Sequence, residues 1–128
     1  SDLNTWEHAF SDLLDRDTSG TVQWWQRNPV SKPWSVRVLL ADGRGFFPDF
    51  IVGVRDRPRE GGVLLTDTKY AFELRSELPK VLAEHAAYGR VLLLHRVGES
   101  QWNVVQFQPQ SRHAVLGEVF RLADAAGY

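Results

Sequence analysis

The sequence contains no cysteine. Disulfide bonds, zinc sites with thiolate ligands and cysteine nucleophiles are therefore all excluded. The four histidines are scattered along the chain, and no two of them lie at the spacing that places metal ligands on one turn of a helix. We accordingly expect no zinc centre.

Long apolar runs and a strong net charge are missing as well. No apolar run approaches the roughly 20 residues that a membrane-spanning helix needs, and no stretch has the pattern of a signal peptide, so we expect a cytoplasmic protein without membrane contact. The net charge is −1, whereas a free-standing nucleic-acid-binding domain is usually basic. Nucleic-acid binding, if present, is thus expected to be local or assisted by another domain. Since methionine is absent too, we expect the chain to be a segment of a longer polypeptide that supplies this assistance.

What the sequence does contain is typical of a globular protein. Hydrophobic residues make up 43% of the 128 residues, with five Trp and seven Phe among them. A chain of this length can bury a core of its own. Because no linker, repeat or low-complexity segment interrupts it, we expect one domain over residues 1–128.

The spacing of apolar residues predicts a mixed α/β (α+β) fold. Apolar residues recur at the period of one helical face in the first segment, and apolar, β-prone runs separated by polar turns follow in the middle of the chain. The expected order is αββββαββα, a mixed sheet flanked by helices. The helices are predicted at 4–16, 76–88 and 114–126, and the strands at 22–27, 34–40, 46–54, 63–69, 90–97 and 102–107.

The most informative stretch runs from residue 46 to residue 69. Two apolar, β-prone runs in it each carry an acid, Asp49 and Asp67, where packing alone favours a hydrophobe. The polar turn between the runs is centred near Pro58, which is also midway between the two acids. If the runs form a hairpin, the two carboxylates face each other with Cβ atoms about 5 Å apart, and Lys69 points to the same face.

Two carboxylates and an ammonium group at one point indicate a site for a divalent cation. Paired anions in a half-buried sheet repel unless one is protonated or a cation lies between them. Mg²⁺ or Mn²⁺ prefers such hard oxygen ligands, and a nearby lysine can orient water or neutralise a phosphate. The alternative is that Asp49 and Asp67 are ordinary surface residues and Lys69 pairs with one of them. We favour the metal site because both acids interrupt apolar runs and the turn symmetry aligns them.

Glu7 and Lys80 have competing interpretations. Glu7 lies at the edge of the buried face of the first helix, where its carboxylate can reach the sheet. The pattern Asn4-x-x-Glu7 is also close to a capping box, and spacing alone leaves both options open. Lys80 lies beside Glu77 and Glu84 on the predicted second helix, which by spacing alone favours a solvated, salt-bridging face.

Other aromatic and basic residues have ordinary structural explanations. Trp24, Trp25 and Trp34 are more typical of core and rim positions than of base-stacking platforms. The arginines within 55–59 are typical of a solvated hairpin turn. The sequence contains neither a P-loop nor a nucleophile elbow.

The acidic residues and their spacing resemble the PD-(D/E)XK nuclease superfamily. The match is Pro48-Asp49, an 18-residue step to Asp67-Thr68-Lys69, and Glu7 on a preceding helix. Over about residues 5–97, the chain is most similar to the nuclease-like domains attached C-terminally to superfamily 2 helicases and type III restriction-type subunits. That closer similarity rests on Glu7, Phe10, Leu13-Leu14-Asp15, Trp24-Trp25, Asn28-Pro29, Phe47-Pro48-Asp49-Phe50 and Asp67-Thr68-Lys69. The resemblance implies a restriction-endonuclease-like mixed sheet.

The resemblance also implies a role for each matching residue. Asp49 and Asp67 correspond to the metal ligands, with the carbonyl oxygen of Thr68 as a third. Lys69 corresponds to the catalytic lysine. Glu7 corresponds to the accessory acid of the first helix, which raises its functional interpretation above the capping one.

Three further positions qualify this correspondence. Lys80 falls on the helix after the motif, where many members have an additional polar residue. Asp67 stands where glutamate is commoner, although the family pattern allows either acid. Tyr70 follows the lysine where helicase-attached members often have glycine, and its bulk can change access to the site.

The function expected from this resemblance is that of an Mg²⁺-dependent (or Mn²⁺-dependent) DNA endonuclease-like domain that hydrolyses phosphodiester bonds. Its expected partners are DNA and a helicase domain of the same polypeptide, in bacterial defence or DNA repair. The alternative is a catalytically inactive nucleic-acid-binding or assembly module with the same fold. RNA stays open as a substrate, because no residue of the sequence is identified as reading a 2′-hydroxyl.

Overall fold

The computed structural model describes residues 4–69 and 78–128. Tyr70, one of the candidate site residues, lies outside this part of the chain. The helical elements are α1 (Thr5–Asp15), η1 (Glu60–Gly62), α2 (Leu78–Val81) and η2 (Leu122–Gly127). The strands are β1 (Val22–Arg27), β2 (Val38–Leu39), β3 (Gly45–Phe46), β4 (Phe50–Val54), β5 (Val63–Lys69), β6 (Glu84–His85), β7 (Gly89–Arg96), β8 (Trp102–Gln108) and β9 (His113–Val119).

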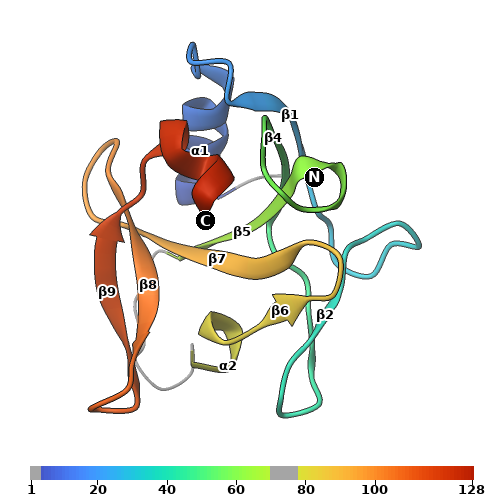
Figure 1. Cartoon of the computed structure of the whole chain (residues 1–128), viewed down its shortest axis with the longest axis vertical. Coiled ribbons are helices and arrows are strands. Elements are labelled where there is room, and N and C mark those ends of the chain that lie inside the picture. The colour runs from blue at the N-terminus through green and yellow to red at the C-terminus, as the bar shows by residue number, and fades with distance from the viewer. Residues whose placement is uncertain (1–3, 70–77) are drawn as a thin grey trace.

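The expected mixed α/β architecture is confirmed, with strands predominating over helices (Figure 1). The main sheet has the strand order β1-β4-β5-β7-β8-β9, with β6 paired to the side of β7, and β2 and β3 form a separate two-stranded sheet. Strand β5 runs parallel to β7 and antiparallel to β4, so the sheet is mixed. The chain between β5 and β7 contains α2 and β6, which form the crossover that a parallel pair requires.

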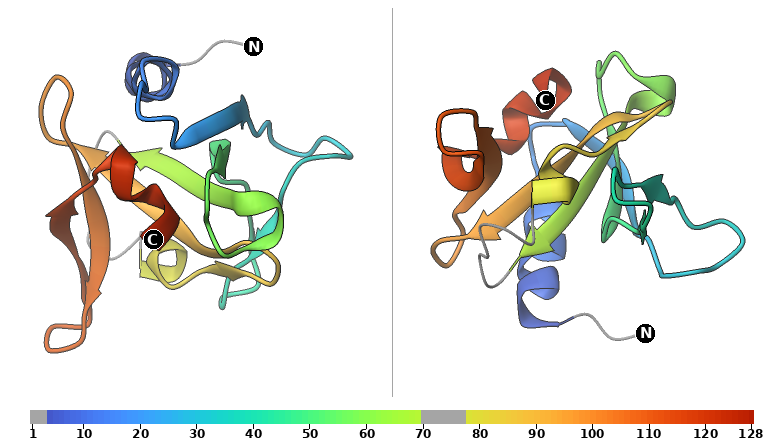
Figure 2. Two further views of the ribbon diagram at one scale, coloured as in Figure 1. Left: turned by 45° about the horizontal axis from the view of Figure 1, so that its top comes forward. Right: turned by 90° about the horizontal axis from the view of Figure 1, so that it is seen from below.

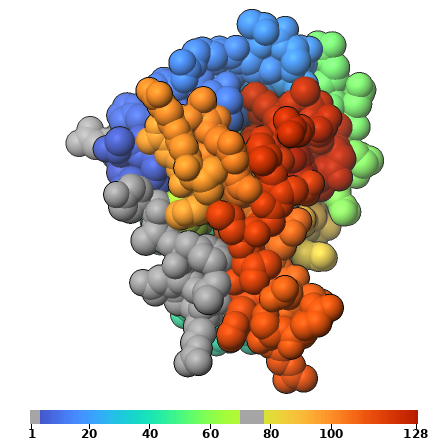
Figure 3. Space-filling view, turned by 90° about the vertical axis from the view of Figure 1, so that its left-hand side faces the viewer, coloured from blue at the N-terminus to red at the C-terminus, as the bar shows by residue number. Residues whose placement is uncertain are grey.

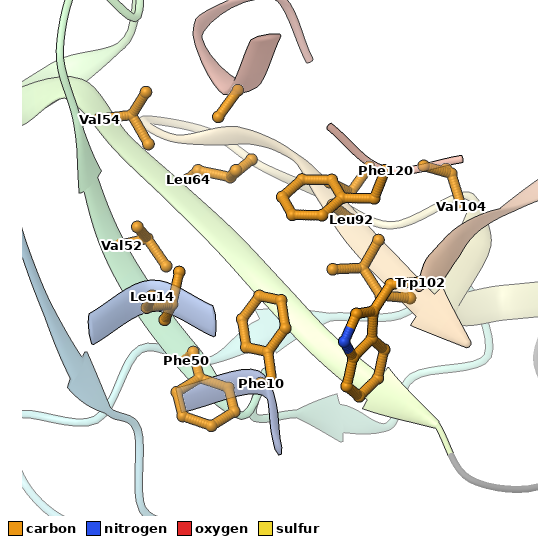
Figure 4. Packing of buried hydrophobic residues seen from close by; sticks show 12 residues of the cluster. Phe10, Leu14, Phe50, Val52, Val54, Leu64, Leu92, Trp102, Val104 and Phe120 are labelled. Carbon is orange, nitrogen blue, oxygen red and sulfur yellow. The ribbon is translucent and has the colours of Figure 1, made fainter. Parts of the chain in front are cut away.

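Both faces of the central sheet are buried, by different elements. Phe50, Val52 and Val54 of β4 belong to one hydrophobic cluster, which also takes side chains from α1, β8 and η2 (Figure 4). Ile51, between them, belongs to a second cluster with side chains from the β2–β3 sheet and α2. In Figure 1, α2 and β6 lie on the other side of β7 from α1 and η2. The alternation of side chains along each strand thus produces a three-layer arrangement.

An aromatic cluster attaches α1 to the sheet. The ring of Phe10 is fully buried, with its centroid 5.2 Å from that of Phe50, 5.4 Å from that of Trp102 and 6.2 Å from that of Phe120. These contacts join the N-terminal helix to the C-terminal half of the sheet, and the two segments lie side by side on the face shown in Figure 3. Because Glu7 is on the same helix, this packing also fixes where Glu7 lies.

The predicted closing helix at 114–126 is wrong. This segment forms β9, which pairs antiparallel with β8, followed by the 3-10 turn η2. The connection between Gln108 and His113 is tight, and Arg112 within it adopts a left-handed conformation with φ 58°. This turn places the chain beside the open edge of β8. The backbone hydrogen bonds of that pairing outweigh the helix propensity of the segment, which Gly117 already lowers.

The predicted second helix and two predicted strands are shorter in the structure. Of 76–88, residues 76 and 77 lie outside the described part, the helix covers Leu78–Val81, and the chain then turns into β6. Gly89, with φ 78°, permits the reversal that pairs β6 with β7. The predicted strand 34–40 is reduced to β2, and the predicted strand 46–54 is divided into β3 and β4 around Pro48, which has no amide hydrogen for a ladder. The order αββββαββα is therefore not reproduced in detail.

Arg57 is buried, contrary to the expectation that the arginines of the 55–59 turn are solvated. Its Nε donates to the carbonyl of Val63 at 2.9 Å, and its terminal nitrogens donate to the carbonyls of Tyr128 at 2.8 Å and Tyr88 at 3.2 Å. Arg57 thus binds three segments that are distant in the sequence.

No helix in residues 4–69 and 78–128 has the length and apolar character needed to cross a membrane.

Candidate functional site: two aspartates and a lysine at the end of the sheet

Asp49 and Asp67 meet where β4 begins and β5 ends. Phe50 pairs with Thr66, and the same register continued by one residue places the two aspartates opposite each other. The amide of Asp49 donates to Oδ1 of Asp67 at 3.1 Å. Oδ2 of Asp49 in turn accepts from the amide and from the hydroxyl of Thr68, both at 2.9 Å. The juxtaposition expected from the turn symmetry is confirmed.

A buried asparagine holds the backbone in front of Asp49, and the sequence analysis missed it. The amide of Asn28 donates to the carbonyl of Asp49 at 2.8 Å, and its side-chain nitrogen donates to the carbonyls of Pro48 and Val36, each at 2.8 Å. Its Oδ1 accepts from the amide of Val36 at 2.8 Å. Asn28-Pro29 is among the residues that carry the family resemblance, but no role follows from it there, and an asparagine between a strand and a proline otherwise predicts a simple turn.

Lys69 pairs with the second oxygen of Asp67. Its Nζ lies 3.2 Å from Oδ2 of Asp67, and the two side chains are only 18% and 4% exposed, respectively. Burial and the negative charge of Asp49 raise the pKa of Asp67 to about 7, although the positive charges of Lys69 and Lys80 oppose this shift. Asp67 is therefore a carboxyl group whose ionisation near neutral pH depends on the cations around it.

Glu7 caps the first helix and also lines the cleft that contains the two aspartates. It forms a complete capping box: its amide donates to Oδ1 of Asn4 at 2.9 Å, and its Oε1 accepts from the amide of Asn4 at 3.2 Å. It also lines the same cleft as the two aspartates. Burial and the negative charge of Asp49 raise the pKa of Glu7, so this carboxyl group is electrostatically part of the site.

Lys80 faces the site from α2. It lines the cleft, and its Nζ lies 4.8 Å from the centroid of the Phe46 ring, within the range of a cation–π contact. Its charge also lowers the pKa of Asp67. Lys80 is half-buried at the cleft and is therefore not on a fully solvated face. Glu77, one of its expected partners, lies outside the described residues.

These residues surround a cleft of about 570 Å³. Its lining includes three acids, Glu7, Asp49 and Asp67, and three bases, Arg44, Lys69 and Lys80. The remaining lining, much of which the sequence analysis assigned to the core or did not consider, consists of Asn4, Trp6, Val30, Leu40, Gly45, Phe46, Phe47 and Thr68. Mixed charge of this kind suits a phosphate ester, whose anionic oxygens need cations while its attacking water needs a base or a metal.

A divalent cation fits the donor atoms that are present, although not as an all-protein cage. In residues 4–69 and 78–128, no group of three or more His, Cys, Asp or Glu side chains is arranged to hold a metal ion. Mg²⁺, however, commonly takes only one or two carboxylates and completes its shell with water and substrate phosphate. A carboxylate offers about four lone-pair positions, so the hydrogen bonds made by Asp49 and Asp67 leave acceptor capacity on both.

Comparisons with models of known protein families, with curated proteins and with solved structures each found no match. The likeness to the PD-(D/E)XK nucleases accordingly stays a prediction, as do the roles of the individual residues. The function has to be argued from the chemistry of the cleft.

The raised pKa of Asp67 predicts how stability changes with pH. Between pH 3.8, the ordinary pKa of this group, and about 7, the folded protein holds a proton on Asp67 that the unfolded chain has lost. The free energy of unfolding should therefore fall as pH rises through this window. Above about pH 7, Asp67 is ionised in both states and causes no further fall. Asp67→Asn, which keeps the shape and removes the titration, should be the more stable protein at about pH 8, by an amount on the order of a few kcal/mol.

Urea unfolding of both proteins at about pH 5 and at about pH 8 measures this difference. The gap between the variant and the wild type should widen at the higher pH. An identical pH dependence in the two proteins would show that Asp67 titrates normally.

Proposed function

We propose that this domain is a metal-dependent phosphodiesterase that cuts nucleic acid. The observation that carries the proposal is the pairing of two carboxylates, Asp49 and Asp67, with Lys69 in an open cleft. The charge pattern is costly in the absence of a ligand, since burial and mutual repulsion raise the pKa of Asp67. Carboxyl groups whose pKa is shifted by burial and a neighbouring charge are typical of functional sites.

Asp49, Asp67 and the main-chain carbonyl of Thr68 would hold an Mg²⁺ or Mn²⁺ ion. When bound, such an ion polarises a phosphodiester and lowers the pKa of a coordinated water. Asp67 has to be ionised to serve as a ligand, so ion binding should release a proton around neutral pH. Lys69, whose Nζ lies 3.2 Å from Oδ2 of Asp67, would stabilise the negative charge that develops on the reacting phosphate.

The remaining charged residues of the cleft have supporting roles in this proposal. Lys80 and Arg44 would bind the phosphate groups that flank the reacting bond. Glu7 would accept a proton or orient water, because burial and the charge of Asp49 raise its pKa above the ordinary value of a glutamate. DNA as the substrate, a helicase as the neighbouring domain, and a role in defence or repair are part of the proposal and rest on the motif resemblance alone.

One observation favours a second candidate, a non-catalytic nucleic-acid-binding or assembly module. This observation is the lack of a three-ligand metal group in the described part of the chain, together with the net charge of −1. Such a module has no need for a pair of facing acids of which one, Asp67, is buried, whereas a nuclease does. Metal dependence therefore separates the two candidates.

A nicking assay tests the proposed function. Supercoiled plasmid is incubated with the protein at low ionic strength in the presence of Mg²⁺, Mn²⁺ or EDTA, with a folded RNA in parallel. We expect nicking with either metal and none with EDTA. Low salt is chosen because a domain of net charge −1 makes few phosphate contacts of its own. Inertness of the domain and of a fusion to a DNA-tethering domain would favour the non-catalytic module.

Metal should also stabilise the fold without any substrate. An ion that binds only the native state raises its stability by mass action, and at about 100 times the dissociation constant the gain is about 2.7 kcal/mol. Thermal melts in EDTA and in millimolar Mg²⁺ or Mn²⁺ measure the shift. Because Asp67 must lose its proton, the shift should be larger above neutral pH than below it. If the midpoint in metal equals the midpoint in EDTA at each of the two pH values, the result would count against a preformed site.

A further inference from the structure

The loop between β1 and β2, residues 28–37, projects from the body of the protein (Figures 1 and 2). We call it the Trp34 loop. Trp34 in this loop is 58% exposed. The sequence analysis assigned this tryptophan to the core or rim, yet the structure presents it to solvent. Val30 of the same loop is 69% exposed, so the loop presents two large apolar side chains to solvent.

The Trp34 loop is held in one conformation by its own hydrogen bonds. Asn28 joins the two ends of the loop through Val36, as described above. Within it, the amide of Ser35 donates to the carbonyl of Lys32 at 3.0 Å, and Oγ of Ser35 accepts from the amide of Lys32 at 3.0 Å. The same hydroxyl donates to the carbonyl of Pro29. A loop organised in this way loses little entropy on binding.

A hollow of about 530 Å³ lies against this loop, lined by Arg27, Pro29, Lys32 and Trp34. Its lining therefore combines two cationic side chains with one aromatic ring, and among the residues described it includes no acidic one. The hollow and the Asp49–Asp67 cleft are linked by neighbouring residues, because Val30 of the same loop lines that cleft and the charge of Arg27 acts on Glu7. A chain lying in the hollow can thus continue towards Asp49 and Asp67.

We propose that the Trp34 loop binds an unpaired nucleotide of the strand that enters the Asp49–Asp67 cleft. Trp34 stacks on the base, and Arg27 and Lys32 bind the adjacent phosphates. The base must be unpaired because in a duplex both of its faces are covered by neighbouring bases, whereas a single strand exposes them. This inference deepens and rests on the proposed function, and it names the substrate class as single-stranded or locally unpaired nucleic acid.

The chemistry of the hollow favours nucleic acid over a protein partner. A protein surface that docks on an exposed tryptophan does not require two neighbouring cations, whereas a nucleotide supplies both a π-face and a phosphate. Substitutions at Trp34 separate the two. Tyrosine keeps a flat ring for stacking, leucine keeps only apolar surface, and alanine removes both.

Fluorescence anisotropy with a short labelled oligothymidylate, in EDTA and at low salt, tests the proposal. The wild type should bind this strand more tightly than a blunt duplex of equal length. Trp34→Ala should weaken binding by about 5- to 150-fold, Trp34→Leu should weaken it similarly, and Trp34→Tyr should retain most of it. Lys32→Ala should reduce the slope of log affinity against log salt by about 0.7.

Leu39→Ala is the matched control, since Leu39 is 65% exposed but lies outside the Trp34 loop, and its affinity should equal that of the wild type. Trp34→Ala binding like the wild type would overturn the inference, and so would full affinity in Trp34→Leu or an equal preference for duplex. Circular dichroism melts of each variant check that the fold is intact.

The measurement separates this inference from the proposed function because no metal is present and nothing is cut. A dependence of binding on Trp34 in a protein that never nicks would support the strand-binding loop and refute the nuclease. The opposite outcome is nicking that requires Asp67, together with a Trp34→Ala variant that nicks and binds oligothymidylate like the wild type. It would refute strand binding by the Trp34 loop and support the nuclease.

Discussion

Asp67→Asn should abolish metal-dependent cleavage, by at least about 10²- to 10³-fold, without disturbing the fold. The amide oxygen of asparagine can still accept the hydrogen bond that the amide of Asp49 donates at 3.1 Å. What the substitution removes is the negative charge that would hold the metal and that repels Asp49 in its absence. Activity should therefore be lost while the stability of the metal-free protein holds or rises. Plasmid nicking with Mg²⁺ and urea unfolding in EDTA measure the two effects.

Asp56→Asn is the matched control for this variant. Asp56 is exposed on the turn after β4, and its left-handed backbone, with φ 62°, is one that asparagine adopts readily. It should cut DNA at the wild-type rate. If Asp67→Asn also cut at that rate, the proposed mechanism would be refuted.

Lys69→Met separates metal binding from charge stabilisation at the same site. Methionine keeps most of the length of the largely buried lysine stem but not its charge. Cutting should fall by about 10²-fold or more, because the lysine meets charge that develops mainly in the transition state. Stabilisation by Mn²⁺ should persist in this variant, whereas it should disappear in Asp67→Asn.

The second large effect is expected in the core. Phe10→Ala should lower the free energy of unfolding by about 3–5 kcal/mol, a large fraction of the stability of a domain of this size. Its ring is fully buried among Phe50, Trp102 and Phe120, and these rigid neighbours cannot close the resulting cavity. Because Phe10 attaches α1 to the sheet, the loss should also free Glu7 from the site.

Urea denaturation measures this loss of stability. Leu116→Ala, on an outward-facing position of β9, is the control and should change stability by about 0.5 kcal/mol or less. A loss of under about 1 kcal/mol in Phe10→Ala would mean that the aromatic cluster does not hold α1 in place.

The part of the site that could be predicted from sequence is the part built by one hairpin. Asp49 and Asp67 flank a single turn, so their opposition follows from counting residues on either side of Pro58. Lys69 then shares their face because side chains alternate along a strand. Local geometry was sufficient here, since no distant segment decides the register.

The parts that could not be predicted depend on distant segments. The segment after Ala114 has residues that suit a helix, but the free edge of β8 offered a ladder partner that no local pattern shows. Asn28 acts through carbonyls at Pro48 and Val36, so its role appears only once the strands are assembled. The contact of Lys80 with the ring of Phe46 likewise depends on a distant segment and is not visible in the local pattern.

The central claim is that Asp49 and Asp67 take one divalent cation between them. Titration of Mn²⁺ into the metal-free protein, followed by electron paramagnetic resonance, measures free and bound ion directly and needs no substrate. At a pH above the raised pKa of Asp67, the wild type should bind Mn²⁺ at a site that is lost in Asp67→Asn and kept in Asp56→Asn. Absence of binding to the wild type at millimolar Mn²⁺, or equal binding by the wild type and Asp67→Asn, would contradict the claim.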